Sequence, residues 1–196
     1  MTQRRASRHR TTAETSISVD LQIDGTGAAT ISTGIAFFDH MLTLLAKHSL
    51  FNLRIEARGD VEVDFHHTVE DTGIVLGQCL KEALGEKAGI RRYGSVLIPM
   101  DEALAQVVID LSGRPFINFR IGEPPRPIGG FDFDLVEEFL RALANNAAMN
   151  LHVEVRYGRN SHHMAEAVFK GLAKALDNAC QIDPRVSGVP SSKGTL

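Results

Sequence analysis

Two histidine clusters constrain the fold of this 196-residue chain more than any other feature of its sequence. One spans residues 66–70 and the other residues 162–166, and both have the pattern H-H-x-x-E. Every residue of the second cluster lies 96 positions after its counterpart in the first, which is about half the length of the chain. Self-similarity at a fixed period indicates an internal duplication. The two halves of the chain are therefore predicted to contain the same elements.

Helical periodicity follows each cluster. Apolar or small residues recur at positions 69, 72, 76, 79, 80 and 83, and the same stripe returns 96 positions later. This spacing predicts two amphipathic helices, over roughly residues 67–86 and 162–180. Two shorter helices are predicted upstream, over residues 39–46 and 137–144, and these are offset by 98 positions.

Strands are predicted where apolar and polar residues alternate. These segments are residues 17–23, 51–57, 103–111, 116–121 and 151–157. Each half then contains strands, a short helix, a strand and a long helix, and neither half could bury both faces of its sheet alone. We expect an α+β fold in which the two duplicated halves pack together around a shared core.

The duplication predicts a single domain over residues 1–196. The first repeat covers about residues 1–92 and the second about residues 93–186, with a boundary near 89–94 that is too short to be a linker. The last residues, 187–196, are small and polar, and we expect them to form a flexible tail.

Composition and charge exclude several classes of protein. The formal net charge of −3 argues against a dedicated nucleic-acid-binding protein, whose phosphate contacts need a basic surface. No apolar run approaches the roughly 18 residues of a membrane-spanning helix. Two cysteines are too few for a disulfide framework and indicate a reducing compartment, so a cytoplasmic location is expected. Four N-terminal arginines, which lack the apolar core of a signal sequence, are expected to form an exposed basic segment: Arg4, Arg5, Arg8 and Arg10.

The H-H-x-x-E pattern suits metal binding when it opens a helix. Residues three or four positions apart share a helix face, so Glu70 can join either His66 or His67 in one site. The two histidines point about 100° apart on a helix, and each cluster therefore suits two ions, or one ion and a site on a neighbouring subunit. His40 and its counterpart Glu138 bring the set to eight nitrogen and oxygen donors without a thiolate, which favours manganese, iron or zinc.

A single cluster of this kind is more often a solvated helix face than a metal site. Packing explains why the apolar stripe is repeated, but packing does not require His, His and Glu in both copies, so metal binding is the better interpretation. Two other functions remain open. The chain could be a metal-dependent hydrolase, although H-E-x-x-H and H-x-x-E-H do not occur, or a scaffold in which metal ions only assemble an oligomer.

Basic and small residues near predicted chain bends could bind an anion. Arg92 and Arg114 offer a bidentate fork to phosphate, and Ser191 and Lys193 lie in a short polar segment whose backbone amides are free. Most surface arginines bind nothing specific, so this pattern by itself is weak. No P-loop, G-x-G-x-x-G or G-x-S-x-G motif occurs.

Several longer motifs, distributed in order along nearly the whole chain, resemble those of the imidazoleglycerol-phosphate dehydratases. They are Asp39-His40-Met41-Leu42 followed by His48, His66-His67-Thr68-Val69-Glu70-Asp71, Met100-Asp101-Glu102-Ala103-Leu104-Ala105, Asp110-Leu111-Ser112-Gly113-Arg114-Pro115, and Asn160-Ser161-His162-His163 with Glu166-Ala167 and Phe169-Lys170. The resemblance implies a duplicated α+β fold and two manganese ions per active site. It also implies a large homo-oligomer, typically of 24 chains, in which the ligands of the ions come from different subunits.

The resemblance further implies roles for individual residues. The family's metal ligands match His40, His66, His67, Glu70, His162, His163 and Glu166. The eighth ligand position falls at Glu138, where many members have His. The residues that contact the substrate match Glu14, Arg92, Arg114, Ser191 and Lys193. A smaller departure is Ala13, before Glu14, where Lys is common.

The implied reaction removes water from D-erythro-imidazole glycerol phosphate and yields imidazole acetol phosphate, in L-histidine biosynthesis. Two manganese ions on the two ring nitrogens would stabilise an imidazolate. Proton transfer needs a positioned acid or base, for which Glu14 is the first candidate and Glu166 or a metal-bound water are the alternatives. The expected partners are this small phosphorylated imidazole and further copies of the chain, and neither nucleic acid nor a membrane.

Overall fold

The computed structural model describes residues 4–122 and 125–196, and its elements form two halves with the same order of three strands, a helix, a strand and a helix. The first half contains β1 (Arg5–Thr11), β2 (Thr15–Gln22), β3 (Ala29–Ser32), α1 (Ala36–Ser49), β4 (Asn52–Gly59) and α2 (His66–Leu84). The second half contains β5 (Tyr93–Met100), β6 (Ala103–Asp110), β7 (Phe116–Ile121), α3 (Asp134–Ala147), β8 (Asn150–Tyr157) and α4 (Ser161–Cys180).

Each half forms its own four-stranded sheet, and the two sheets have equivalent strand orders, β1-β2-β4-β3 and β5-β6-β8-β7. In each of these orders the first three strands pair antiparallel, and the fourth strand runs parallel to the third. The identical topology confirms the predicted α+β fold with an internal duplication. It also confirms the four predicted helices, each with a few more or fewer residues at its ends.

Side-chain alternation sets the register of the strands. In β2, Ile17, Val19 and Leu21 are buried, and the polar residues between them point to the other face. Val19 pairs with Ile55 of β4, which is also fully buried, so both strands present their apolar sides to the same face of the sheet. A slip by one residue would expose this whole set, and the core therefore specifies the pairing.

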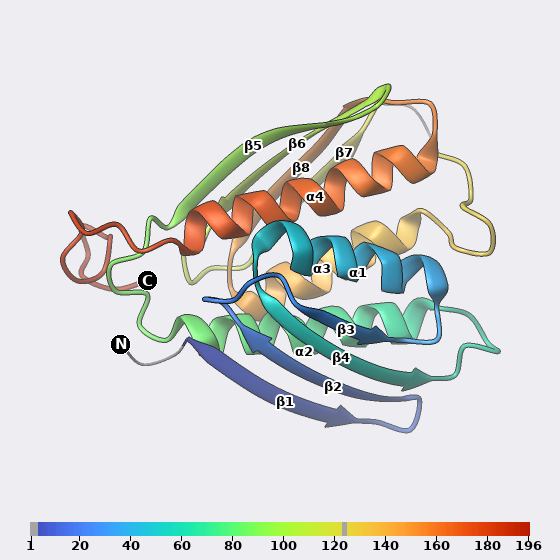
Figure 1. Ribbon diagram of the computed structural model, residues 1–196, viewed down its shortest axis with the longest axis horizontal. Helices are drawn as coiled ribbons and strands as arrows, with labels where there is room; N and C mark the ends of the chain where they lie inside the picture. Colours follow the sequence, from blue (N-terminus) through green and yellow to red (C-terminus); the bar gives the residue numbers. More distant parts are fainter. Residues whose placement is uncertain (1–3, 123–124) are drawn as a thin grey trace.

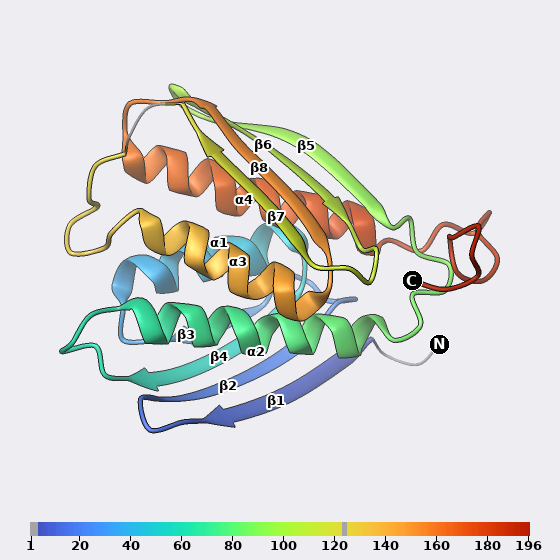
Figure 2. The ribbon, with the colours of Figure 1, turned by 180° about the vertical axis from the view of Figure 1, so that it is seen from behind.

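The four helices lie between the two sheets (Figures 1 and 2). Helices from different halves contact each other, α1 with α4 and α2 with α3, and α2 and α4 also cover the inner faces of their own sheets. The apolar residues of both sheets and all four helices form one continuous core. The two halves thus bury each other's helices, which is how a chain of this length obtains its core.

The first turns of all four helices lie on the same side of the molecule, at the right of Figure 1. His66 opens α2 and Ser161 opens α4, so both histidine clusters lie at this end. The helix α4 has 20 residues and spans about 30 Å at a rise of about 1.5 Å per residue. Residues at its two ends are therefore far apart within one chain.

The basic segment at the N-terminus is largely exposed, as expected, but it forms a strand that the sequence did not predict. Residues Arg5–Thr11 form β1, an edge strand that pairs with β2 along its whole length. Its only buried side chain is Ala6, so it has no apolar alternation that the sequence could have revealed. Two of its arginines form ion pairs with α2, Arg8 with Glu82 and Arg10 with Asp71.

Two further strands, β3 and β5, were not expected from the sequence. The β5 strand begins within the boundary predicted near residues 89–94 and forms one edge of the second sheet. Its side chains alternate only weakly between buried and exposed, and it contains Pro99. The strand nevertheless packs closely on α4, since a Cβ at Gly94 would come within 2.0 Å of the Ala175 carbonyl oxygen. The short β3 is mostly exposed and is held by parallel pairing to β4.

The residues after α4 contain neither helix nor further named strand, yet the C-terminal segment is tied to the connection between the halves. The Gly89 amide donates to the carbonyl of Gly188 at 2.8 Å, and Arg92 donates to the carbonyl of Pro190 at 2.9 Å. Among the described residues, no helix combines the length and apolar character that crossing a membrane requires.

Candidate metal centre

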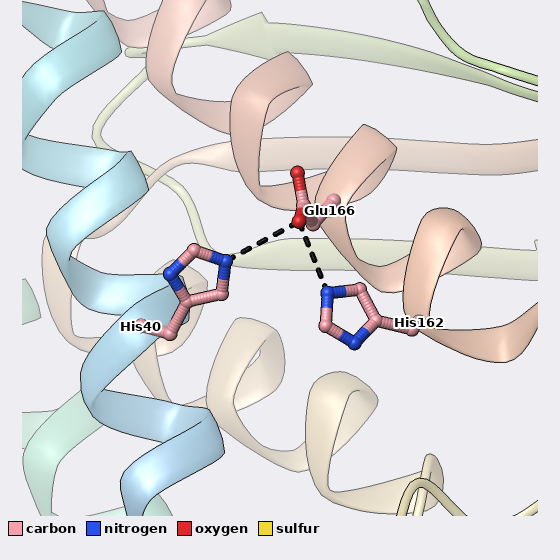
Figure 3. Close-up of side chains that lie close together, drawn as sticks. All are labelled: His40, His162 and Glu166. Carbon is pink, nitrogen blue, oxygen red and sulfur yellow. Dashed lines mark hydrogen bonds and ion pairs between the residues drawn. The ribbon is translucent and has the colours of Figure 1, made fainter.

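One cluster of potential metal ligands joins the two halves of the chain. His40 lies on α1, and His162 and Glu166 lie one turn apart on α4. The Nε2 atoms of His40 and His162 are 3.2 and 3.0 Å from the same carboxylate oxygen, Glu166 Oε1. Figure 3 shows both imidazole rings turned toward this carboxylate. One donor atom from each residue lies within 4.8 Å of the others, a geometry that could hold a metal ion.

The Glu166 carboxylate is held in its charged form although it is buried. Its other oxygen, Oε2, is 2.6 Å from the Lys170 ammonium, one turn further along α4. Burial by itself would raise the pKa of Glu166, but hydrogen bonds from Lys170, His40 and His162 outweigh it and lower the pKa to about 2. A carboxylate that is ionised and surrounded by donors is a competent oxygen ligand for a divalent cation.

A second group of potential ligands lies in a groove between α2 and α3. His66 and Glu138 line this groove together with Asp132 and Asp134, and its volume is about 420 Å³. Glu70 lies one helical turn after His66, with its carboxylate 3.9 Å from the His66 Nε2 atom. This group is the counterpart of the first, because α3 brings Glu138 toward the cluster of α2 as α1 brings His40 toward the cluster of α4.

His67 faces a different direction from His66 and approaches two carboxylates. Its Nδ1 atom is 3.0 Å from Asp60 and 3.9 Å from Glu14. The hydrogen bond with Asp60 raises the pKa of His67 above its ordinary value. Glu14 is exposed in the turn between β1 and β2, where its amide donates to the Thr12 hydroxyl at 3.1 Å.

His163 has a similar carboxylate partner. Its Nδ1 atom is 2.7 Å from Glu102, which lies in the turn between β5 and β6, and its Nε2 atom is 3.8 Å from Asp101. The hydrogen bond from His163 lowers the pKa of Glu102 to about 2, and the same bond raises the pKa of His163. The structure therefore brings three of the eight predicted ligands together at Glu166, places His66 near Glu70 and in one groove with Glu138, and gives His67 and His163 other carboxylate partners.

The residues predicted to contact a phosphate lie at the other end of the molecule. The Arg92 amide donates to the Ala179 carbonyl at 2.9 Å, near the end of α4 and 17 residues after His162, which is about 25 Å away along the helix. The Leu111 amide donates to the Arg92 carbonyl, and Arg114 follows Leu111 by three residues. The Arg92 side chain donates to the Pro190 carbonyl, which places the segment with Ser191 and Lys193 beside Arg92. Within one chain, the structure does not bring these residues to the histidines.

Sequence reasoning missed the groups that hold the predicted ligands. Asp60 and Glu102 contact His67 and His163, and Lys170 contacts Glu166. Glu102 and Lys170 lie within the motifs of the family resemblance, but His163 lies 61 residues after Glu102, so no spacing along the sequence connects these two residues. Lys170 follows Glu166 by four residues, and that spacing was a signal for the ion pair.

Comparison with known proteins now decides the family. The family model for imidazoleglycerol-phosphate dehydratase matches residues 33–176. The chain belongs to the imidazoleglycerol-phosphate dehydratase family. It is 62% identical to the imidazoleglycerol-phosphate dehydratase of Geobacillus kaustophilus, with 95% of this chain and 96% of that protein covered. It is 61% identical to the imidazoleglycerol-phosphate dehydratase of Akkermansia muciniphila, with 98% and 100% covered.

Solved structures of imidazoleglycerol-phosphate dehydratases have the same fold. The Staphylococcus aureus enzyme has a TM-score of 0.83 and 41% sequence identity, with 91% of this chain and 99% of that chain covered. The Pyrococcus furiosus enzyme, in complex with (S)-C348, has a TM-score of 0.82 and 37% identity, with 96% and 100% covered. Membership of the imidazoleglycerol-phosphate dehydratase family makes this chain a hydro-lyase with a part in histidine biosynthesis.

Proposed function

We propose that the chain dehydrates D-erythro-imidazole glycerol phosphate to imidazole acetol phosphate, with two Mn²⁺ ions at each active site. The family supports the reaction, and the donor set supports the metal. The eight candidate ligands are imidazoles and carboxylates without a thiolate, and two of the imidazoles already converge at Glu166 Oε1. When bound to the imidazole ring, the two ions would act as Lewis acids and lower the cost of deprotonating it.

The protein's own groups would perform the remaining tasks. Glu14 carries an exposed carboxylate 3.9 Å from His67 and is the proposed acid/base that moves the proton at C2 of the substrate. Arg92, Arg114, Ser191 and Lys193 would bind the phosphate and so orient the rest of the substrate. Glu166 remains the alternative acid/base, although three donors already hold its charge.

The separation between the two sets of residues is the observation that carries the proposal about assembly. The candidate phosphate-binding residues and the histidines of α4 lie about 25 Å apart on one chain, and this substrate, with three carbons between its ring and its phosphate, is much shorter. One active site must therefore combine the histidine end of one subunit with the Arg92 end of another. We propose a homo-oligomer, of 24 chains as in the family, with its active sites at subunit interfaces.

Glu14→Gln tests the proposed acid/base. The variant should bind Mn²⁺ and substrate as the wild type does, while turnover falls by about 10²–10⁴-fold. Glu56→Gln is a matched control, since Glu56 is exposed on β4 and pairs with Arg54. Turnover near that of the wild type in Glu14→Gln would remove Glu14 from the catalytic role and leave Glu166 as the candidate.

Removal of the metal tests the shared sites. If ions bridge subunits, chelation should convert the oligomer into smaller species, and addition of Mn²⁺ should restore it, as measured by light scattering after size-exclusion chromatography. The Mn²⁺-loaded oligomer should also bind imidazole-containing phosphates. Assembly that depends on metal without such binding would support a scaffold instead of an enzyme site.

We further propose a cytoplasmic location. Cys79 and Cys180 are both buried and free, as expected for a chain that folds in a reducing compartment.

A further inference from the structure

The second histidine of each H-H-x-x-E cluster has a carboxylate at the same ring nitrogen. His163 Nδ1 is 2.7 Å from Glu102, and His67 Nδ1 is 3.0 Å from Asp60. The two histidines are equivalent in the duplication, but these two carboxylates lie at different places in their halves. Glu102 directly precedes β6, as Glu14 directly precedes β2, whereas Asp60 directly follows β4, at the place where Gly158 follows β8. Glu14 is 3.9 Å from His67 Nδ1, beyond hydrogen-bond distance, so Asp60 is the carboxylate that hydrogen-bonds His67. Both halves therefore place a carboxylate at this ring nitrogen, which indicates a local requirement.

The requirement concerns the tautomer of the imidazole. An ionised carboxylate only accepts hydrogen bonds, so each histidine must carry a proton on Nδ1, which leaves the Nε2 lone pair free for a metal ion. His40 and His162 differ, because they direct Nε2 toward Glu166 and have no such contact at Nδ1 among the described residues. The carboxylate therefore distinguishes the second histidine of each cluster from the first.

Glu102 is itself held firmly. Its Oε1 atom accepts hydrogen bonds from the Arg159 and Asn160 amides, at 3.1 and 2.7 Å, while Oε2 faces His163. Asn160 is the N-cap of α4, and its side chain accepts a hydrogen bond from the amide of His162. One carboxylate thus joins the β5–β6 turn, the start of α4 and the His163 ring.

From this geometry we propose that Glu102 and Asp60 are positioning residues that hold His163 and His67 for metal binding through Nε2. Neither carboxylate needs to touch the ion, because each acts through the imidazole that it orients. The inference rests on the metal-dependent function proposed above and adds two residues to it. It predicts that Glu102 and Asp60 affect metal affinity and not only folding.

The test is a Mn²⁺ titration of the metal-free protein, with free Mn²⁺ measured by electron paramagnetic resonance. Glu102→Gln keeps the size of the side chain and an acceptor for the two amides, but it loses the charge. One class of Mn²⁺ sites should bind about 10–100-fold more weakly in this variant. Glu86→Gln, a substitution at an exposed residue after α2, should bind Mn²⁺ as the wild type does.

A double-mutant cycle separates positioning from loop stability. In the His163→Ala background, Glu102→Gln should cause no further loss of Mn²⁺ affinity, because its effect passes through His163. Asp60→Asn with His67→Ala is the parallel cycle, and it decides the matter if Glu102→Gln does not fold. Thermal unfolding of each metal-free variant reports the structural contribution separately.

Each result bears on a different proposal. Wild-type Mn²⁺ affinity in Glu102→Gln, or an equal loss with and without His163, would overturn the positioning role while the metal-dependent function stands. If the wild type binds no Mn²⁺ at all, both this inference and the proposed metal fail together. Weaker binding that disappears in the His163→Ala background would establish the role.

Discussion

Gly73 of α2 lies directly against the carbonyl oxygen of Phe139 in α3, and a Cβ at Gly73 would approach that oxygen to 2.7 Å. Four residues later, Gly77 has the same relationship with the carbonyl oxygen of Leu143. The backbones of α2 and α3 therefore approach closely across the boundary between the two halves. This close approach brings Glu138 of α3 into the same groove as His66 of α2.

Gly73→Ala should destabilise the protein despite the better helix propensity of alanine. The added methyl would meet a backbone oxygen, which cannot move aside as a side chain can, and overpacking of this kind costs about 1–3 kcal/mol. Urea unfolding should show the loss. Gly130→Ala is the control, because a Cβ at Gly130 meets nothing within 4 Å. A gain in stability for Gly73→Ala would show that the helices separate without cost.

Asp71 is expected to support the turn that carries Glu14. The buried Asp71 carboxylate accepts hydrogen bonds from Arg10 and from the Thr15 hydroxyl, and Thr12 in the same turn accepts from the amides of Glu14 and Thr15. Asp71→Asn should lower the free energy of unfolding by about 1.5–3 kcal/mol, the usual contribution of hydrogen bonds to a charged group. Turnover should fall as well, because the turn loosens.

Glu82→Gln is the matched control for Asp71→Asn. Glu82 also joins α2 to β1, through Arg8, but both of these side chains are about half exposed. Exposed ion pairs contribute only about 0–1 kcal/mol, so this variant should retain both stability and turnover. Equal losses of stability in the two variants, measured by urea unfolding, would contradict the distinction between the buried and the exposed pair.

The two cysteines should be unreactive until the protein unfolds. Burial raises the pKa of both Cys79 and Cys180 from about 9.0 to about 12, so the folded protein holds neutral, inaccessible thiols at pH 8. A thiol reagent such as DTNB should modify neither cysteine in the folded protein and both in denaturant. Rapid modification of a cysteine without denaturant would contradict its burial.

The same shifts predict how stability depends on pH. Above pH 9 the thiols of the unfolded chain ionise, while those of the folded chain keep their protons until about pH 12. The folded state then binds more protons, and the free energy of unfolding must fall as the pH rises through this window. Cys180→Ala should reduce that slope in urea unfolding between pH 8 and pH 10, and an unchanged slope would assign it to other groups.

Asp110→Asn should weaken substrate binding more than it slows turnover. Asp110 accepts hydrogen bonds from Arg92 at 2.7 and 3.0 Å, and Arg92 in turn donates to Pro190, just before Ser191 and Lys193. Loss of the charge should release Arg92 and the adjoining segment. We expect KM to rise about tenfold, which corresponds to about 1.4 kcal/mol and lies near the value of one hydrogen bond to a charged group.

Asp20→Asn is a suitable control for Asp110→Asn, since Asp20 is exposed on β2. Steady-state kinetics on the assembled enzyme would separate KM from kcat. A fall in kcat with an unchanged KM would contradict the phosphate-binding role and indicate that Arg92 acts elsewhere in the reaction.

Periodicity predicted those parts of the fold in which one face of an element is buried. The stripes after His66 and His162 are amphipathic over a whole helix, and β2 alternates strictly, so pattern and structure agree. The edge strands β1 and β5 were missed because backbone pairing with a neighbouring strand holds them, and their own side chains are mostly exposed or half-buried. Pairing of this kind leaves no periodic signal in the sequence.

In the candidate site, too, some relationships follow from the sequence and others only from the tertiary structure. The repeated H-H-x-x-E clusters identify their own histidines and glutamates, since neighbours on one helix follow from spacing alone. Spacing carries no information about which helices meet. Only the packing of α1 on α4 and of α2 on α3 brings His40 to Glu166 and Glu138 to the groove of His66. Packing also leaves the Arg92 end about 25 Å from the histidines, because a straight helix separates its two ends by its full length.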